Sequence, residues 1–274
     1  TYQTAKNLVK RGHEVHLLLH HPKSIGHALE DCKVKYEETV DGIKVSRLKY
    51  IGPSYLYFTL VIGMMAKRAV KIIKEENIDV ILAHNPPYIV GLSALEAGKI
   101  TGKPVVLNLH DPWGSTHHNF FEYNVGMFLE KLCTKKADAI VTASKTIPRT
   151  LKERHGIPEK KCYVAPNAVD VERFDVKAED VEKALKKYNI PKNKPIVMFM
   201  GSLAKWNGVE HVVDAAKYLK DVNVVLVGGG RHEEELRAQA KGMKNVIFTG
   251  LVPYDEVPNM LAMADVCVAP FPRV

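Results

Sequence analysis

Residues 195–202 read Pro-Ile-Val-Met-Phe-Met-Gly-Ser, and they begin the stretch of sequence that decides the fold. Three comparable segments follow: Asn-Val-Val-Leu-Val-Gly-Gly-Gly-Arg (223–231), Asn-Val-Ile-Phe-Thr-Gly-Leu-Val-Pro (245–253) and Ala-Asp-Val-Cys-Val-Ala-Pro-Phe (264–271). Each contains a short apolar run with β-branched residues, which is typical of a buried strand. Glycine follows the first three runs at the carboxyl end of the expected strand, the edge where parallel sheets bind ligands. Because glycine lets a backbone approach a phosphate closely, these segments predict a nucleotide-binding half-fold.

The rest of the chain alternates in the same way between strand and helix patterns. Strands separated by helices of this length indicate parallel sheets with right-handed crossovers. We expect strands at 14–19, 44–49, 79–83, 104–109, 138–143 and 161–165, and helices at 2–11, 57–76, 89–99, 124–136, 145–154 and 179–188. Residues 166–194 show no strand pattern, and we interpret them as a connection. The sequence thus predicts an α/β protein with two Rossmann-like domains, residues 1–168 and 169–274, the second including the linker.

Composition places the chain among ordinary globular proteins, because 46% of its residues are hydrophobic and 26% are charged. Its four cysteines lie far apart in the sequence and form no C-x-x-C pair. This usage indicates reduced thiols rather than a disulfide framework or a zinc site. We therefore expect a cytoplasmic protein.

Positive charge is concentrated in the first predicted domain. The chain has 39 Lys and Arg against 31 Asp and Glu, and the whole excess of 8 lies in that domain. Residues 51–65 are apolar and aromatic, and Lys67, Arg68, Lys71 and Lys74 follow them. This stretch is shorter than the roughly 20 residues of a membrane-spanning helix, but it suits peripheral contact with an anionic membrane. The alternative is a core helix with a solvated basic end. Nucleic acid is not expected as a partner, because no recognition motif accompanies the charge.

Several short motifs occur in a distinctive order. They are Ala-Lys-Asn-Leu-Val-Lys-Arg-Gly-His-Glu-Val (5–15), Ala-Asp-Ala-Ile-Val-Thr-Ala-Ser (137–144), Pro-Asn-Ala-Val-Asp-Val-Glu-Arg-Phe (166–174), Leu-Val-Gly-Gly-Gly (226–230), Phe-Thr-Gly-Leu-Val-Pro (248–253) and Ala-Asp-Val (264–266) with Pro270. In this order and spacing they resemble the GT-B-fold glycosyltransferases of family 4 (glycosyl transferases group 1), retaining enzymes that use nucleotide-activated sugars. The resemblance covers nearly all of the chain and implies a glycosyltransferase of the hexosyltransferase type.

His110 is the candidate catalytic residue. It follows the strand expected at 104–109 and matches the histidine that the family places in its acceptor-domain cleft. The resemblance implies that His110 hydrogen-bonds the transferred sugar or shapes the pocket; a purely structural role in its loop is the alternative. His84 ends the preceding strand and lies where it would line the same cleft, but we interpret it as structural.

No metal or other cofactor is expected, and the nucleotide diphosphate sugar serves as co-substrate. The pairs His20-His21 and His117-His118 have no further ligands at a recognisable spacing. The sequence also contains no Asp-x-Asp pair for a divalent ion.

The donor-binding residues follow from the same resemblance. They are Gly201, Ser202, Lys205, Asn207, Gly208, Gly228, Gly229, Gly230, Arg231 and Val252. The family carries Arg directly after the first glycine and Lys before a later one, whereas this chain has Ser202 and Asn207 there. Because the leaving diphosphate must be stabilised, we expect Lys205 or Arg231 to supply the missing positive charge. The three glycines at 228–230 are expected to approach the donor; a plain turn is the alternative.

Together these patterns predict transfer of a sugar from a nucleotide diphosphate sugar to a lipid-linked sugar, a polysaccharide or a phosphorylated polyol, with retention. The alternatives are a sugar-nucleotide epimerase of the same fold and a non-catalytic sugar-nucleotide-binding module. The first strand of the fold and the family's two glutamates, which would follow residue 273, are expected to be missing. We therefore expect both domains to be incomplete and this fragment to be inactive by itself.

Overall fold

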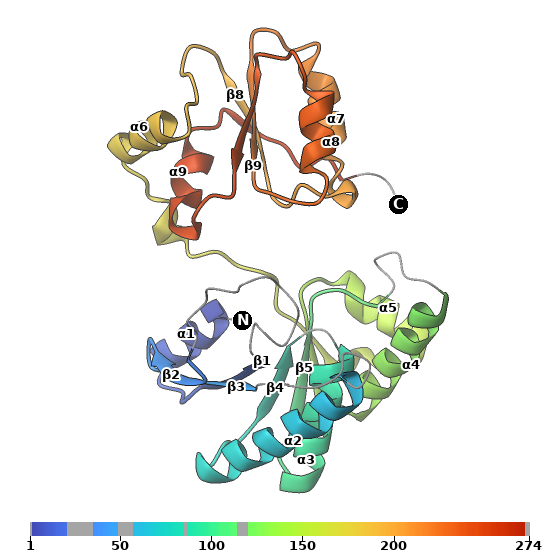
Figure 1. Ribbon diagram of the computed structural model, residues 1–274. Coiled ribbons are helices and arrows are strands. Elements are labelled where there is room, and N and C mark those ends of the chain that lie inside the picture. The colour runs from blue at the N-terminus through green and yellow to red at the C-terminus, as the bar shows by residue number, and fades with distance from the viewer. Residues whose placement is uncertain (1, 21–34, 49–56, 85–86, 114–119, 272–274) are drawn as a thin grey trace. The chain divides into compact units, whose positions relative to one another are not determined.

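The computed structural model describes residues 2–20, 35–48, 57–84, 87–113 and 120–271. They form two compact units, Thr1–Asn167 and Ala168–Val274. In each unit, strands of a mainly parallel sheet are connected by helices (Figure 1). The predicted α/β fold with Rossmann-like sheets is therefore confirmed. The two units are described separately below.

The first unit contains two sheets. The larger one is entirely parallel and has the order β4 (Ile81–His84), β5 (Val105–Leu109), β6 (Ala139–Thr142) and β7 (Cys162–Val164). The smaller one has the order β1 (His16–His20), β3 (Ile43–Leu48) and β2 (Glu37–Val40), with β2 antiparallel to β3. The carboxyl ends of β4 to β7 form one edge of the larger sheet.

Strand β2 was not expected from the sequence. It pairs with β3 through a two-residue turn at Asp41-Gly42, with Val40 opposite Ile43. Both turn residues have positive φ, 50° for Asp41 and 77° for Gly42, as a type I′ hairpin turn requires. The Asp-Gly pair was the available signal, but β2 is short and largely exposed and lacks an apolar run.

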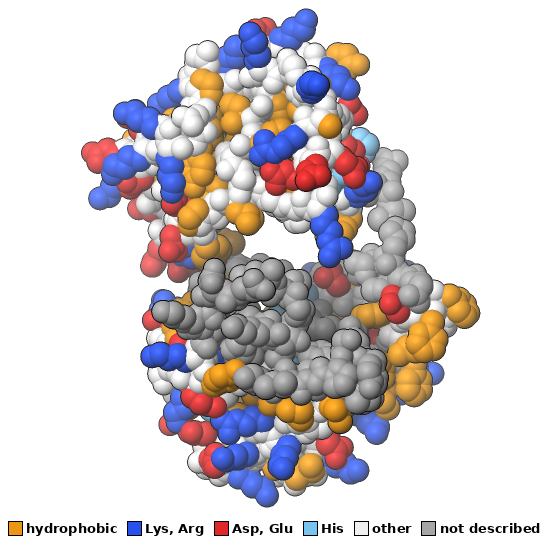
Figure 2. Space-filling view, viewed as in Figure 1, with side chains coloured by type: hydrophobic (Ala, Val, Ile, Leu, Met, Phe, Trp, Pro, Cys, Tyr) orange, Lys and Arg blue, Asp and Glu red, His pale blue; other side chains and the backbone are white. Residues whose placement is uncertain are grey.

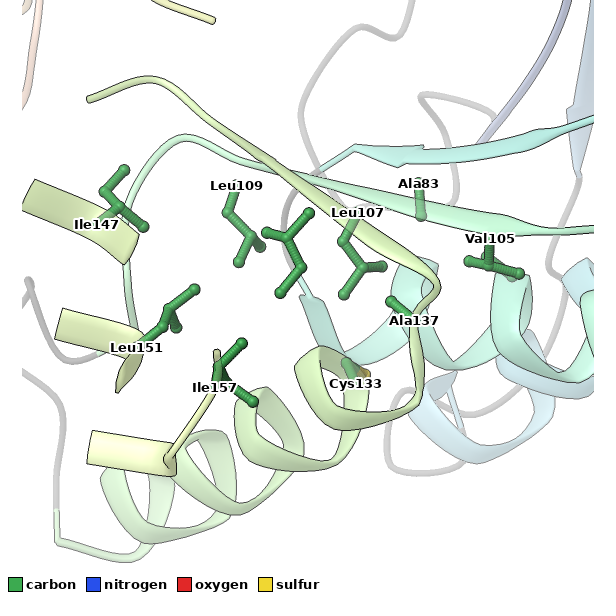
Figure 3. Close-up of a cluster of buried hydrophobic side chains, with 11 residues drawn as sticks. Ala83, Val105, Leu107, Leu109, Cys133, Ala137, Ile147, Leu151 and Ile157 are labelled. Carbon is green, nitrogen blue, oxygen red and sulfur yellow. The ribbon is translucent and has the colours of Figure 1, made fainter. Parts of the chain in front are cut away.

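Helices cover the sheets of the first unit. They are α1 (Tyr2–Lys10), α2 (Tyr57–Glu75), a π-helical turn (Pro87–Gly91), α3 (Leu92–Thr101), α4 (Phe120–Lys136), α5 (Thr146–His155) and the 3₁₀ turn η4 (Glu159–Lys161). The main core lies between the larger sheet and these helices (Figure 3). Leu107 and Leu109 of β5 point toward α4 and α5, where Cys133 and Leu151 pack against the same cluster.

Helix α2 packs on α3 and buries much of its apolar surface. Val61, Met65 and Ala66 are at most 4% exposed, whereas Leu60 and Met64 are partly exposed. These side chains fit the alternative of a core helix with a basic end. The rest of the apolar stretch, residues 51–56, lies outside the described residues. Among the helices that the structure describes, none is long and apolar enough to cross a membrane.

The second unit has one parallel sheet with the order β10 (Val246–Gly250), β9 (Asn223–Val227), β8 (Ile196–Met200) and β11 (Val266–Cys267). Numbered in chain order, the strands lie in the order 3-2-1-4. This is the arrangement of nucleotide-binding sheets in which the strand order reverses beside the first strand. Its helices are α6 (Ala178–Lys187), α7 (Val209–Ala216), α8 (Glu233–Gln239) and α9 (Val257–Ala262), with 3₁₀ turns η5 (Val171–Phe174), η6 (Lys205–Asn207) and η7 (Tyr254–Glu256).

Strand β9 is buried on both faces, which explains the continuous apolar run from Val224 to Val227. Val224 and Leu226 belong to a core cluster with α7 and α8, while Val225 and Val227 belong to a second cluster with α6 and α9 (Figure 1). The sequence had suggested that α6 was part of a connection. Its Leu185 packs into the second cluster, so α6 is a covering helix of this sheet.

Candidate active site

In the second unit, the loops that follow β8 and β9 are joined by backbone hydrogen bonds. The amide of Gly201 donates to the carbonyl of Val227 and that of Leu203 to Gly229, each at 3.0 Å. The amide of Gly228 donates to the carbonyl of Gly250 at 2.9 Å, which connects the end of β10 to the same assembly. The structure thus brings the predicted donor segments 201–208 and 228–231 together at the carboxyl edge of the sheet.

Two of the three consecutive glycines are required by this loop packing. A Cβ atom added at Gly228 would lie 2.0 Å from the carbonyl oxygen of Gly201, and one at Gly230 would lie 2.3 Å from that of Leu203. Gly228 also has a φ of 129°, which side-chain-bearing residues rarely adopt. Gly229 has room for a Cβ at an ordinary contact distance of 3.4 Å from Leu251. Close approach of two backbones therefore explains Gly228 and Gly230.

The same packing leaves hydrogen-bond donors at the loop surface. Among the backbone hydrogen bonds of the described residues, none uses the amide N–H of Gly229 or Gly230. Gly229 is half-buried and Gly230 is exposed. Successive amide groups in such a turn form a concave site that suits an anion.

The loop after β8 is closed by its own side chains. The side-chain amide nitrogen of Asn207, Nδ2, donates to the backbone carbonyl oxygen of Ser202 at 2.7 Å. Gly208 has a φ of 63° and is the N-cap residue that precedes helix α7. Ser202 is exposed, so its hydroxyl is accessible, whereas Asn207 already uses its amide to hold the loop.

Both candidate cations are exposed. Lys205 Nζ lies 3.2 Å from Glu235 Oε2, and the two side chains are 71% and 61% exposed. The hydrogen bond from Lys205 holds the pKa of Glu235 below its usual value. For Arg231, also exposed, the part of the chain that the structure describes provides no ion pair within 4.0 Å. Val252 follows β10, and its half-buried side chain packs against the core cluster with α9.

A buried histidine beside this loop was missed in the sequence. His232 is 9% exposed, and its Nδ1 lies 3.0 Å from Glu235 Oε2 while its Nε2 lies 3.8 Å from Glu210 Oε2. Its amide donates to the carbonyl of Leu203, which adds a further link between the two loops. Its position directly after the triple glycine and Arg231 was the available signal.

In the first unit, the structure places His84 and His110 side by side. They lie at the ends of the neighbouring strands β4 and β5, and their ring centroids are 4.7 Å apart. The side-chain amide of Asn108 lies 3.1 Å from His84 Nδ1. Because an amide nitrogen only donates, His84 accepts this bond with an unprotonated Nδ1.

Burial lowers the pKa of His84, and the neighbouring His110 lowers it further. A neutral imidazole is therefore favoured at this position near pH 7. The Nε2 atom of His110 is buried and finds no hydrogen-bond partner among the described residues. Both histidines thus lie at the carboxyl edge of the sheet, where open α/β sheets bind ligands.

The remaining predicted features, the histidine pairs and the region after residue 271, are not part of the contacts described above. His21, His117 and His118 are outside the described residues, as is the region after residue 271. Within the described parts of the chain, no group of three or more His, Cys, Asp or Glu side chains is placed to hold a metal ion.

Comparisons with known proteins agree with this architecture. Residues 1–173 match Glycosyltransferase Family 4, and residues 180–273 match Glycosyl transferases group 1. A glycosyltransferase of Methanocaldococcus jannaschii is 23% identical over 97% of this chain and 68% of its own length. An N-acetylgalactosaminyltransferase of Campylobacter jejuni is 27% identical over 89% of this chain and 62% of its own length. Across eight curated relatives that it matches, the chain spans from 32% to 68% of their length.

Solved structures show the same fold. The sucrose-phosphate synthase of Thermosynechococcus elongatus superposes with a TM-score of 0.77 at 17% identity, covering 98% of this chain and 68% of that one. HepE of Anabaena, in complex with UDP and glucose, superposes with a TM-score of 0.66 at 20% identity, covering 84% of this chain and 61% of that one. Since the first family match covers well over half of the residues, the chain belongs to Glycosyltransferase Family 4 and has the GT-B fold.

Proposed function

We propose that the protein transfers a sugar from a nucleotide diphosphate sugar to an acceptor hydroxyl, with retention of the anomeric configuration and without a metal ion. The bond between the anomeric carbon and the diphosphate breaks, and the acceptor oxygen forms the new glycosidic bond and releases its proton. Family membership supports this activity. The observation that carries it is the joined pair of loops after β8 and β9, with the amides of Gly229 and Gly230 unused among the described backbone hydrogen bonds.

The carboxyl edge of the sheet in the second unit, where we place the sugar donor, has the groups that a departing diphosphate needs. Negative charge develops on the leaving group, and preorganised donors aimed at it are a large source of rate enhancement. The two glycine amides supply fixed donors, and Lys205 or Arg231 supplies the charge. UDP in the HepE complex makes a uridine nucleotide a suitable first probe.

On the acceptor side, we assign His110 to a hydrogen bond with a hydroxyl of the transferred sugar. Its buried Nε2 finds no partner in the described residues, so a bound sugar would satisfy it. A buried polar atom without a partner costs about 1–3 kcal/mol, and this cost is removed when substrate binds. Burial lowers the pKa of His84 beside it, which favours a neutral imidazole there near pH 7.

The test is a panel of nucleotide sugars offered to the intact protein with and without candidate acceptors. We expect one donor to be consumed and the product to keep the anomeric configuration of the donor, as read by NMR. His110→Ala should lower kcat/KM about fivefold or more, since one hydrogen bond contributes about 1 kcal/mol or more. His13→Ala, which changes an exposed histidine before β1, should leave kcat/KM unchanged.

Two other outcomes would contradict the proposal. Nucleotide-sugar binding without turnover would favour a non-catalytic binding module. Inversion at a sugar carbon without transfer would favour an epimerase, and the UDP-GlcNAc 2-epimerase of Neisseria meningitidis does share the fold, with a TM-score of 0.61 at 13% identity.

We further propose that the acceptor is lipid-linked and that the first unit contacts an anionic membrane through α4. The name of the Campylobacter jejuni relative specifies a diphospho-undecaprenol acceptor. Phe121, Val125 and Phe128 are spaced along one face of α4, opposite its buried face, and are 75%, 40% and 64% exposed. In Figure 2, hydrophobic side chains gather over this helix. Exposed Lys131 and Lys135 lie beside the apolar face.

An amphipathic helix of this kind suits the membrane interface, where aromatic residues enter the lipid and lysines meet anionic headgroups. Monomeric proteins seldom expose a contiguous apolar patch larger than a few hundred Å² unless it marks an interaction site. The first unit also holds the whole excess positive charge of the chain, which adds long-range attraction to an anionic surface.

Vesicle sedimentation tests this contact. We expect binding to phosphatidylglycerol vesicles that weakens as salt is raised. The double variant Phe121→Ser/Phe128→Ser should reduce the partition coefficient about tenfold or more, because burial of each phenylalanine stabilises by about 1.5–3 kcal/mol. Tyr218→Ser, which removes an 87% exposed aromatic from the second unit, is the matched control. Equal, salt-independent binding to phosphatidylcholine would overturn the assignment.

A further inference from the structure

Glu130 is a buried carboxylate that connects two helices to the segment after β5. It lies on α4 and is 0% exposed. One of its oxygens, Oε1, lies 2.7 Å from Nε2 of His155, the last residue of α5, whose side chain is 3% exposed. The other, Oε2, accepts the backbone N–H of Trp113. Both oxygens of the carboxylate are therefore engaged inside the protein.

Trp113 lies three residues after His110, and α4 and α5 hold it at three points. Glu130 holds its backbone N–H, and the guanidinium of Arg154 donates to its carbonyl oxygen at 2.7 Å. Its indole lies against Gly126, where an added Cβ would come within 1.9 Å of the ring. The position of the segment that carries His110 is thus fixed by contacts from two helices.

Stability alone does not account for a carboxylate at this position. Removing an ionised carboxylate from water costs several kcal/mol, and apolar residues of similar volume often stabilise a core as well or better. Leu107, Leu109 and Leu151 already supply such a core between β5 and α5. An apolar residue, however, has no acceptor for the backbone N–H of Trp113. The carboxylate therefore provides orientation, and a displacement of about 1 Å in a reactive site can lower the rate about 100-fold.

We propose that Glu130, supported by His155, is a positioning residue for His110. It fixes the segment 110–113 at the carboxyl edge of the sheet so that the His110 ring meets the transferred sugar. The inference rests on the proposed transferase function, but it assigns a role to a group that does not itself touch substrate. The contact is specific, because the carboxylate accepts from the backbone of Trp113 and not from a replaceable side chain.

The decisive variant is Glu130→Leu/His155→Leu in the intact protein. It replaces the buried polar pair by apolar side chains. The fold then keeps its packing, while the backbone N–H of Trp113 loses its acceptor. We expect the melting temperature to change little, kcat for transfer to fall about tenfold or more, and the affinity for UDP to stay the same. Glu130→Gln keeps an amide oxygen for the Trp113 N–H, and should recover most of the lost kcat.

Fluorescence gives a readout that is independent of catalysis. The chain has two tryptophans, so Trp206→Phe leaves Trp113 as the single reporter. In that background, Glu130→Leu/His155→Leu should make Trp113 more accessible to acrylamide, and Glu130→Gln should not. Unchanged quenching or unchanged kcat in a folded Leu/Leu protein would overturn the inference. Absence of transfer in the wild-type protein would contradict the proposed function instead, and the quenching comparison would still decide whether Glu130 holds the segment.

Discussion

Gly228→Ala is expected to abolish UDP binding and to destabilise the protein by about 3 kcal/mol or more. The new Cβ would lie 2.0 Å from the carbonyl oxygen of Gly201, and the φ of 129° adds strain that glycine avoids. Unfavourable backbone conformations cost about 1–3 kcal/mol by themselves. The clash is with backbone, so the loops after β8 and β9 must separate. Thermal melting should show a decrease of about 10 °C or more, since 1 kcal/mol corresponds to about 4–8 °C in a domain of this size.

The neighbouring glycine provides a matched control. Gly229→Ala adds the same methyl group, but its nearest contact is Leu251 at 3.4 Å. We expect this variant to fold with a nearly unchanged melting temperature and to bind UDP with an affinity within a few fold of wild type, measured by calorimetry. If Gly228→Ala and Gly229→Ala behaved alike in both assays, close packing of the two loops would not be the reason for the glycines.

Most strands and helices of both units could be predicted because their sequence patterns are local. Strand β9 is buried on both faces, and its four positions after Asn223 are all apolar, so the run is easily recognised. Strand β2 has no such run because its side chains are mostly exposed. Helix α4 begins at Phe120, earlier than expected, and its first aromatic residues are exposed rather than buried. Hydrophobic periodicity therefore gave no signal of the true start of α4.

The residues of the candidate site could be predicted only in part from the sequence, for a different reason. Glycines at strand ends mark a ligand-binding edge by their position in the sequence, and the structure brings these segments together. The role of Glu130 depends on Trp113 and His155, which lie 17 and 25 residues away. Such a contact exists only once α4 and α5 have packed on the sheet. The sequence offers no periodic or spacing signal for it.

Lys205→Ala is expected to lower kcat/KM of the intact protein by about 100-fold or more. The family's usual cations are replaced by Ser202 and Asn207, and the structure places the Lys205 side chain on the same loop. The lysine acts as a point charge on a flexible stem and needs no fixed fork geometry. Loss of a group that stabilises developing negative charge typically costs about 2.7–4 kcal/mol of transition-state stabilisation.

The ion pair with Glu235 does not prevent this role. Both side chains are more than half exposed, and pairs of this kind contribute about 0–1 kcal/mol. A diphosphate, with more negative charge than one carboxylate, can therefore displace Glu235. If Glu235 competes with the nucleotide for Lys205, Glu235→Gln should tighten UDP binding a few fold. The effect should decrease as salt is raised, because the competition is between exposed charges.

A second exposed lysine of the same unit separates this role from a general effect of charge. Lys217 forms a comparable ion pair with Asp214 at 2.6 Å, with side chains 48% and 52% exposed. Lys217→Ala removes the same charge away from the glycine loops and should leave kcat/KM unchanged. Arg231→Ala tests the other candidate cation, which follows the triple glycine. Both cations are carried by the joined loops, but only the one that reaches the phosphates should affect the rate. Unchanged kcat/KM in Lys205→Ala together with a large loss in Arg231→Ala would therefore assign stabilisation of the leaving diphosphate to Arg231.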